Sequence, residues 1–255
     1  MEQTSNGDVI AGRNAVLEAI RAGRELDTIY LAEPENPTAQ RGNPLGKIRA
    51  LARDRGIVVK AADRRKLDQL APGTNHQGVV ALCACMEYAT VEDILAVSDA
   101  KGTAPFLLIA DEIEDPHNLG AILRTAEACG ADGIILPKRR SAPMGATVYK
   151  TSAGAASVVK VARVPNLAAC VRDLKQRGIW FYGAEMDGAP WCETDFTGPA
   201  ALIIGSEGRG ISRLLREECD FLVSLPMVGQ INSLNASVAA GILMYEVVRQ
   251  RRQGR

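Results

Sequence analysis

The sequence predicts two α/β domains, the second built on a mostly parallel sheet with helices on both faces. The chain has 255 residues, more than one average domain, and 47% of them are apolar. Short helical and strand patterns alternate over 1–88, whereas 105–255 contains the continuous apolar runs typical of buried parallel strands. The segment 89–104 has three acidic residues and one lysine. We interpret it as the connection, with one turn of helix.

The first domain begins with a helical pattern that ends at Gly23 and is followed by strand formers. A polar loop over 33–44 separates this pair from a basic amphipathic pattern. The expected elements are, in order, a helix at 14–23, a strand at 28–33, a helix at 46–56, and strands at 57–61 and 78–86.

The second domain is expected to be a doubly covered sheet, because its apolar runs alternate with amphipathic segments. The last segment repeats apolar residues at helical spacing. We expect strands at 106–110, 133–137, 179–185, 200–205 and 221–226, and helices at 118–130, 168–178, 211–220 and 233–252.

Hydropathy and cysteine content favour a soluble, cytoplasmic protein. No apolar run approaches the roughly 18 to 20 residues that span a bilayer, and the first ten residues have no leader-like pattern. Of six scattered cysteines only Cys83 and Cys85 are close together, and the chain has two histidines. That spacing does not suit a zinc site. We therefore expect buried free thiols and no metal.

Charge is balanced over the whole chain but not along it. Thirty basic and thirty acidic residues cancel, so the chain lacks the basic excess of many nucleic-acid-binding proteins. Between Arg41 and Lys66, however, the sequence has nine basic residues and only two acidic ones. Two interpretations stay open for this stretch: a solvated helix face, or a surface that contacts phosphates.

Ligands of open α/β sheets bind at the carboxyl ends of the strands, and three loops there are unusual. In the first, after 106–110, Asn118 lies where the helix starts and Arg124 further along it. Taken alone, an asparagine at that position favours a helix cap, and an arginine a solvated side chain.

The second loop, after 200–205, contains Gly205, Gly208 and Gly210 around Glu207. These glycines let the backbone approach a ligand closely. Their spacing matches neither the dinucleotide fingerprint nor a P-loop, which argues against a nicotinamide-dependent oxidoreductase. Glu207 has two interpretations, a carboxylate that holds the loop's backbone donors or one that takes part in chemistry.

The third loop, after 221–226, places a polar cluster at the start of the last helix. A single side chain is enough to cap a helix, so the excess favours a binding site. The cluster consists of Asn232, Ser233, Asn235 and Ser237.

Together the three loops resemble the three motifs of the SpoU (TrmH-like) branch of the SPOUT RNA methyltransferases. They read NLGAILRTA, IGSEGRG and LPMVGQINSLNASVA, in that order, and the match covers roughly 105–252. In the first domain, VIAGRNAVLEAI and HQGVVA resemble the L30e-like substrate-binding domain of RlmB-type enzymes, which methylate a guanosine of 23S ribosomal RNA.

The resemblance implies a trefoil-knotted SPOUT domain that holds S-adenosyl-L-methionine between its loops, and a homodimer. Arg124, Asn118, Glu207, Ser233 and Asn235 match its catalytic positions. Cofactor contacts fall on Gly205, Leu225, Leu234, Ala184 and Met227. Expected RNA contacts are Arg13, Asn14, His76, Gln77, the basic stretch from Arg41, and Lys138, Arg139 and Arg140.

The implied reaction is an attack by a ribose 2′-hydroxyl on the methyl group of a sulfonium. In family proposals the arginine, here Arg124, removes the proton. A guanidinium is charged in proteins, so Arg124 could instead stabilise the developing alkoxide or hold a neighbouring phosphate. The preferred substrate is ribosomal RNA; the alternatives are transfer RNA and a non-catalytic RNA-binding role.

Overall fold

The computed structural model describes residues 9–32, 44–84 and 86–253. The chain divides into two compact units. The first comprises 1–87 with 143–146, and the second 88–142 with 147–255. Each unit has its own hydrophobic core.

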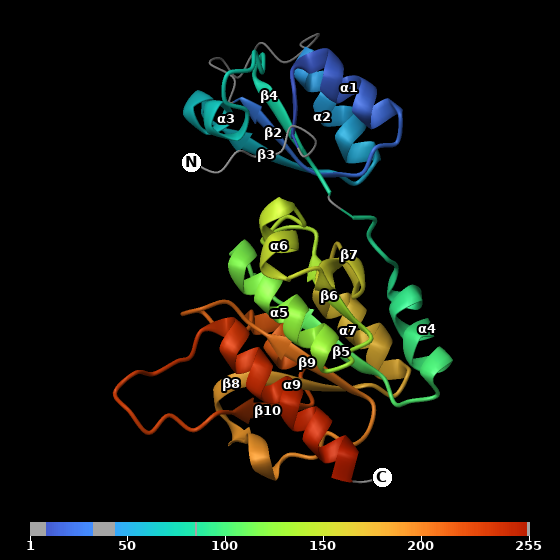
Figure 1. The fold of residues 1–255 in the computed structure, drawn as a ribbon, viewed down its shortest axis with the longest axis vertical. Coiled ribbons are helices and arrows are strands. Elements are labelled where there is room, and N and C mark those ends of the chain that lie inside the picture. The colour runs from blue at the N-terminus through green and yellow to red at the C-terminus, as the bar shows by residue number, and fades with distance from the viewer. Residues whose placement is uncertain (1–8, 33–43, 85, 254–255) are drawn as a thin grey trace. The chain divides into compact units, whose positions relative to one another are not determined.

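The first unit is a four-stranded mixed sheet with helices on both faces (Figure 1). Its order is β1-β4-β2-β3, with β4 antiparallel to both neighbours and β2 parallel to β3. The strands are β1 (Val9–Ala11), β2 (Leu26–Ala32), β3 (Val58–Ala62) and β4 (Val79–Cys83), and the helices are α1 (Arg13–Arg21), α2 (Pro44–Asp54) and α3 (Arg64–Leu70).

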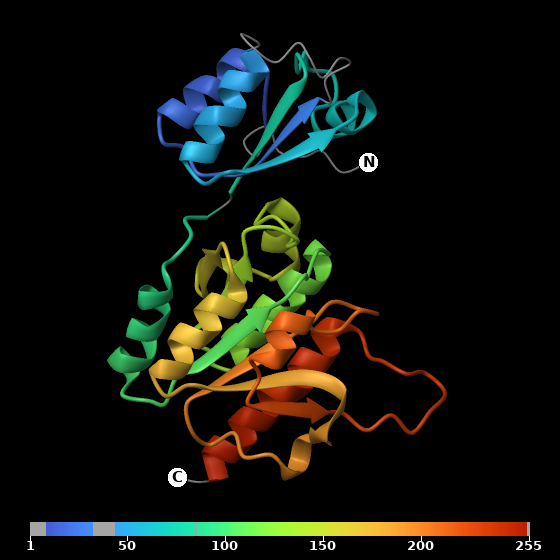
Figure 2. The same ribbon diagram turned by 180° about the vertical axis from the view of Figure 1, so that it is seen from behind.

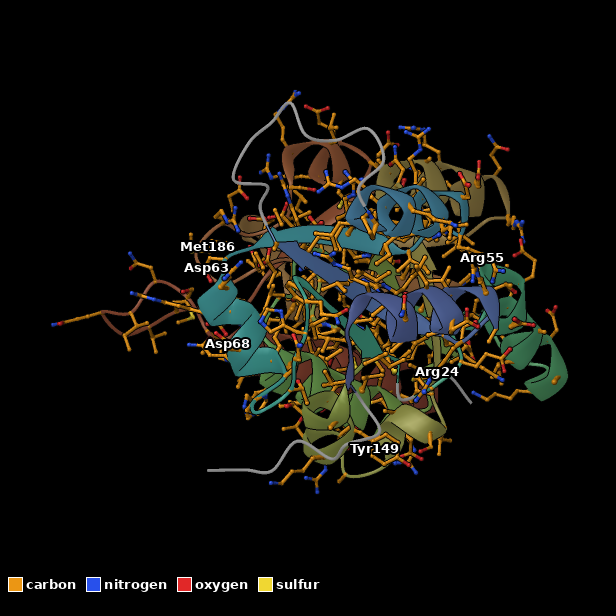
Figure 3. The ribbon with its side chains drawn as sticks, turned by 90° about the horizontal axis from the view of Figure 1, so that it is seen from above. Arg24, Arg55, Asp63, Asp68, Tyr149 and Met186 are labelled. Carbon is orange, nitrogen blue, oxygen red and sulfur yellow. The ribbon has the colours of Figure 1, made fainter. Side chains whose placement is uncertain are left out.

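Alternation along β4 decides which helices cover which face of this sheet. Val79 packs with Val16 of α1 and Ile48 of α2. Val80 faces the other way and packs with Leu67 of α3. Helix α3 was not expected from the sequence. Asp63 caps its N-terminus (Figure 3), because the Asp63 carboxylate accepts a hydrogen bond from Lys66 N at 2.7 Å.

The basic stretch does not form one surface, because six of its described basic residues lie on two helices that cover opposite faces of the sheet. Lys47, Arg49 and Arg53 are exposed on α2, whereas Arg64, Arg65 and Lys66 are exposed on α3. Arg41 lies outside the described residues. A phosphate-contacting surface would therefore use one part of the stretch or the other.

The second unit is a six-stranded parallel sheet of order β10-β8-β9-β5-β6-β7, which confirms the predicted parallel architecture. Helices α5 and α9 cover one face, and α4, α7 and α8 the other (Figures 1 and 2). The strands are β5 (Phe106–Ala110), β6 (Gly133–Pro137), β7 (Lys160–Val164), β8 (Trp180–Pro190), β9 (Ala200–Ile204) and β10 (Phe221–Ser224). The helices are α4 (Val91–Lys101), α5 (Pro116–Ala128), α6 (Ala146–Thr151), α7 (Leu167–Gln176), α8 (Arg213–Glu217) and α9 (Ala236–Gln253).

Burial explains why these strands read as continuous apolar runs. All five residues of β5 are buried, because helices cover both faces of the sheet. Strand β7 was not expected from the sequence, because its five residues include the charged Lys160 and Arg163 and form no continuous apolar run. Of the described helices, none is both long and apolar enough to cross a bilayer.

The segment predicted as a connection, 89–104, is instead largely the helix α4. Thr90 and Asp93 form a capping box at its start, and Gly102 ends it in a left-handed conformation. Ile94 is fully buried and packs with Leu107 and Val171 in the core of the second unit. The acidic residues that suggested a solvated linker belong to the cap and the exposed side of this helix.

The described cysteines form no disulfide with one another. Cys83 is buried as predicted, but Cys192 is exposed because it lies in a short turn after β8, and Cys85 is not described. Within 9–32, 44–84 and 86–253, no group of acidic, histidine and cysteine side chains could hold a metal ion. Burial raises the pKa of Cys129 and Cys170 to about 11 and that of Cys219 to about 12.

The role of α4 in the core can be tested by truncating its buried side chain. Ile94→Ala should lower the free energy of unfolding by about 2–5 kcal/mol, because it opens a cavity in a packed core. Asp99→Ala, on the exposed side of α4, should change it by less than about 0.5 kcal/mol. Urea unfolding followed by circular dichroism measures both, and equal effects would contradict the assignment.

Candidate active site

The second unit has a cavity of about 430 Å³ at the carboxyl edge of its sheet. Its walls come from β8, from the loop after β9, from the loop after β10 and from the first turns of α9. This is the edge at which open α/β sheets bind ligands, and the volume lies in the range of small-molecule sites.

One wall is an excursion of β8 away from its neighbour. Gly183 pairs with Leu222 of β10, but the next paired residue of β8 is Ala189, so 184–188 lie between two parts of the ladder. A Cβ on Gly188 would lie 2.4 Å from the carbonyl carbon of Leu222, and only glycine permits that approach. The excursion places Glu185 and Met186 in the cavity wall. Met186 is 70% exposed there (Figure 3).

The glycine loop after β9 is a tight turn. Ser206 and Gly210 exchange two backbone hydrogen bonds, of 3.1 and 2.9 Å. A Cβ on Gly205 would lie 2.2 Å from the carbonyl carbon of Gly210. Glu185 fixes the far end of the loop, because its carboxylate accepts from Ile211 N at 2.7 Å. Two walls of the cavity are thus joined by one half-buried hydrogen bond.

Glu207 joins the glycine loop to α5 and α9. Its Oε1 accepts from Asn118 Nδ2 at 2.8 Å, from Asn235 Nδ2 at 2.5 Å and from the backbone N–H of Ala236 at 3.3 Å. Asn235 Nδ2 also donates to Asn118 Oδ1 at 2.8 Å. The three motifs identified in the sequence therefore meet in one hydrogen-bonded network.

The orientation of Asn235 follows from its neighbours. Its Oδ1 accepts from the backbone N–H groups of Ser237 and Val238, at 3.0 and 3.3 Å, and so caps α9. Because those groups can only donate, the amide nitrogen must face Glu207. Asn118, in contrast, is not the cap of α5: Asp115 accepts from His117 N, and Asn118 is the third helical residue. Its side chain is left to bind Glu207.

All five residues predicted to contact the cofactor line the cavity, namely Ala184, Gly205, Leu225, Met227 and Leu234. Three polar residues that line it were not expected from the sequence, namely Glu185, Ser206 and Arg209. The buried Ser206 Oγ has no hydrogen-bond partner among the described residues. An orphaned hydroxyl, a carboxylate and apolar walls fit a ligand that combines polar groups with a flat aromatic ring, as S-adenosylmethionine does.

The other two predicted catalytic residues differ in position. Ser233 is exposed and lines the cavity. Arg124 is exposed on α5 and does not line the cavity, and its side chain makes no hydrogen bond or ion pair with any described residue. The single chain therefore brings Asn118 and Asn235 together on Glu207, which lines the cavity, and leaves Arg124 outside this network.

Three of the four RNA-contact candidates in the first unit are brought together. Arg13 Nε donates to the carbonyl oxygen of Gln77 at 3.0 Å, and Gln77 has a positive φ of 50°. His76 Nε2 lies 3.1 Å from a carboxylate oxygen of Asp68 on α3 (Figure 3). Asn14 is exposed on the first turn of α1. In the second unit, Lys138, Arg139 and Arg140 follow β6 at the carboxyl edge.

Comparisons with known proteins agree with this geometry. Residues 105–245 match the SpoU rRNA Methylase family, and 9–89 match a domain described as RNA 2′-O ribose methyltransferase substrate binding. A TrmH family tRNA/rRNA methyltransferase of Bacillus subtilis, YacO by name, is 47% identical over 96% of both chains.

Two solved structures are similar. The SpoU methyltransferase AviRb of Streptomyces viridochromogenes, in complex with AdoMet, has a TM-score of 0.60 and 27% identity, covering 96% of this chain and 91% of that one. A TrmH/SpoU tRNA modifying enzyme of A. aeolicus has a TM-score of 0.55 and 29% identity, covering 60% and 78%.

The parallel sheet, the cavity at its carboxyl edge and the matched substrate-binding domain define an RNA methyltransferase that uses S-adenosylmethionine. The chain belongs to the SpoU rRNA methylase family.

Removing the hydroxyl of Ser206 should affect the stability of the free protein and its affinity for the cofactor differently. Ser206→Ala should leave the stability of the free protein unchanged or slightly higher, because the hydroxyl has no partner there. Affinity for S-adenosylmethionine should fall by about three- to tenfold, the worth of one hydrogen bond. Ser212→Ala, outside the cavity, should change neither. Thermal unfolding and calorimetric titration measure the two quantities, and unchanged affinity would contradict the assignment.

Proposed function

We propose that the protein methylates the 2′-hydroxyl of a ribose in structured RNA. The observation that carries the proposal is the network of Glu207, Asn118 and Asn235 beside the cofactor cavity. It is supported by the match of 9–89 to a substrate-binding domain of RNA 2′-O ribose methyltransferases. A non-catalytic RNA-binding role is disfavoured because such a role needs neither the network nor the cavity.

S-adenosylmethionine supplies a methyl group activated on a sulfonium. The residues of the chain then have to align the ribose hydroxyl and assist the loss of its proton. Glu207 lines the cavity and fixes both amides beside it, so Asn118 and Asn235 are positioned to orient the ribose. Ser233 offers a hydroxyl at the same cavity, as donor or acceptor to the ribose.

Arg124 is proposed to act on the ribose or its phosphate once RNA and a second subunit are in place. A groove between α5 and α9 has Val238 and Tyr245 about half exposed, beside the small residues Thr125 and Gly241. A second copy of this chain would bury these apolar side chains. The proposed homodimer would complete the site on the face of α5 that carries Arg124.

A guanosine of 23S ribosomal RNA is the proposed substrate. The separate N-terminal domain supports it, with Arg13, Asn14, His76 and Gln77 as its RNA contacts, and such a substrate would place the enzyme in the cytoplasm. Transfer RNA is the second candidate, because the relatives include a tRNA/rRNA methyltransferase and a tRNA modifying enzyme. We also expect the trefoil knot of this fold in the chain.

Removing the guanidinium tests the role of Arg124. Arg124→Ala should lower kcat at least about 100-fold, the usual loss when one transition-state donor is removed. Affinity for the cofactor should stay within about twofold, because Arg124 does not line the cavity. The control is Arg177→Ala: Arg177 lies at the C-terminal end of α7, at the opposite edge of the sheet. Normal methylation by the Arg124 variant would overturn the assignment.

The substrate can be found by mapping 2′-O-methyl groups in RNA from cells that lack the protein. We expect one guanosine of 23S ribosomal RNA to lose its methyl group. A methyl group lost from transfer RNA, with ribosomal RNA unchanged, would contradict the ribosomal assignment and support the second candidate.

A further inference from the structure

Beside the cavity, two residues with left-handed backbone conformations form a side-chain hydrogen bond with each other. Glu112 follows β5 and has a φ of 55°, and Arg140 follows β6 and has a φ of 56°. Non-glycine residues rarely adopt this conformation, and it tends to occur at functional sites. Arg140 Nη1 donates to Glu112 Oε1 at 2.6 Å. Both ends of one ion pair are thus held in an unfavourable conformation by their surroundings.

The same carboxylate reaches a second arginine. Glu112 Oε2 lies 3.5 Å from Arg209 Nη2, and Arg209 belongs to the glycine loop that lines the cavity. The Glu112 side chain is only 14% exposed, whereas those of Arg140 and Arg209 are 69% and 71% exposed. The carboxylate therefore lies beneath two guanidinium groups that face solvent at the rim of the cavity.

A purely structural role does not account for this arrangement. Ion pairs with an exposed partner contribute little to stability, less than two left-handed residues cost. The loops concerned are also held by other bonds: Asp111 accepts from Ser212 N at 2.7 Å, and Ala142 N donates to the carbonyl oxygen of Ile113 at 2.8 Å. The backbone strain is better explained by a ligand that needs both guanidinium groups in place.

The chemistry of the pair indicates the ligand. Each guanidinium has five N–H donors in a planar fork, and Glu112 contacts only one nitrogen of each. Two arginines and one glutamate leave a net positive charge. The hydrogen bond to Glu112 raises the pKa of Arg140, which keeps that guanidinium charged. Lys138 and Arg139 add positive charge next to it in sequence, and the carboxylates of Glu114 and Asp111 oppose it.

We propose that Arg140 and Arg209, held ready by Glu112, form a clamp for one phosphodiester of the RNA, next to the ribose that is methylated. The proposal rests on the function proposed above. Two guanidinium forks match the two non-bridging oxygens of a phosphodiester. Glu112 lowers the cost of binding, because it orders both arginines before the RNA arrives. Arg209 is thereby assigned to RNA, although it belongs to the cofactor loop.

The test uses the full chain and separates RNA binding from methyl transfer. Arg140→Ala should raise the KM for RNA about tenfold, with kcat and cofactor affinity within about twofold, because Arg140 does not line the cavity. The slope of log affinity against log salt should fall by roughly 0.7–0.9, the value for one phosphate contact. Arg140→Lys keeps the positive charge but loses the planar set of guanidinium donors. Its salt slope should match that of the wild type, and its KM for RNA should lie between those of the wild type and Arg140→Ala.

Two further variants complete the set. Glu112→Gln should raise the KM for RNA by a smaller factor than Arg140→Ala, because a neutral amide has one acceptor oxygen for two arginines. Arg177→Ala removes an arginine that, like Arg140, is paired with a glutamate, here Glu92, and it should change neither the KM for RNA nor the salt slope.

Two results would overturn the clamp: an unchanged KM and salt slope in Arg140→Ala, or a parallel loss of cofactor affinity and thermal stability, which a loop-tying role predicts. RNA affinity measured by fluorescence anisotropy needs no methyl transfer. A wild-type protein that binds RNA through Arg140 but transfers no methyl group would therefore contradict the proposed function and leave the clamp standing.

Discussion

The carboxylate of Glu207 is the interaction on which the site depends. It accepts from Asn118 on α5, from Asn235 before α9 and from the first amide of α9, and so ties three strand-end loops together. A carboxylate has no donor, and its charged oxygen accepts from N–H groups more strongly than the oxygen of an amide or an alcohol does. The two asparagines in turn acquire fixed orientations. Glu207 thus acts by positioning, whichever group accepts the proton.

The parallel sheet makes this convergence possible. Because the strands of such a sheet share one carboxyl edge, loops that are far apart in the sequence meet there. Glycines then allow close approach at two points, where Gly205 meets Gly210 and where Gly188 meets the backbone of β10. The same edge carries Glu112 and Arg140, so cofactor cavity, polar network and charged rim lie on one side of one sheet.

Much of this site could be predicted from the sequence, because the apolar runs of the buried strands show where the loops at the carboxyl edge begin. The five residues expected at the cofactor all line the cavity, and the polar cluster before α9 contributes Ser233 to the cavity and Asn235 to the network of Glu207. Contacts between side chains that are far apart in the sequence could not be predicted in the same way, because no local pattern marks them. Asn118 was interpreted as a helix cap, but the cap of α5 is Asp115. The segment that forms α4 was interpreted as a linker because its acidic residues are typical of a solvated segment, although one side of the helix is buried. The bond between Glu112 and Arg140 depends on backbone conformations that no spacing encodes. Arg124 was found by motif alone, and one chain does not bring it to the cavity.

Methyl transfer to a ribose oxygen can be distinguished from methyl transfer to a base by the resistance of the RNA to alkali. A 2′-O-methyl group removes the nucleophile that cleaves the adjacent phosphodiester, whereas a methyl group on a base does not. The purified protein, incubated with ribosomal RNA and S-adenosylmethionine, should protect one bond from alkaline hydrolysis, and Asn235→Ala should abolish the protection. Methyl incorporation without any protected bond would contradict ribose methylation.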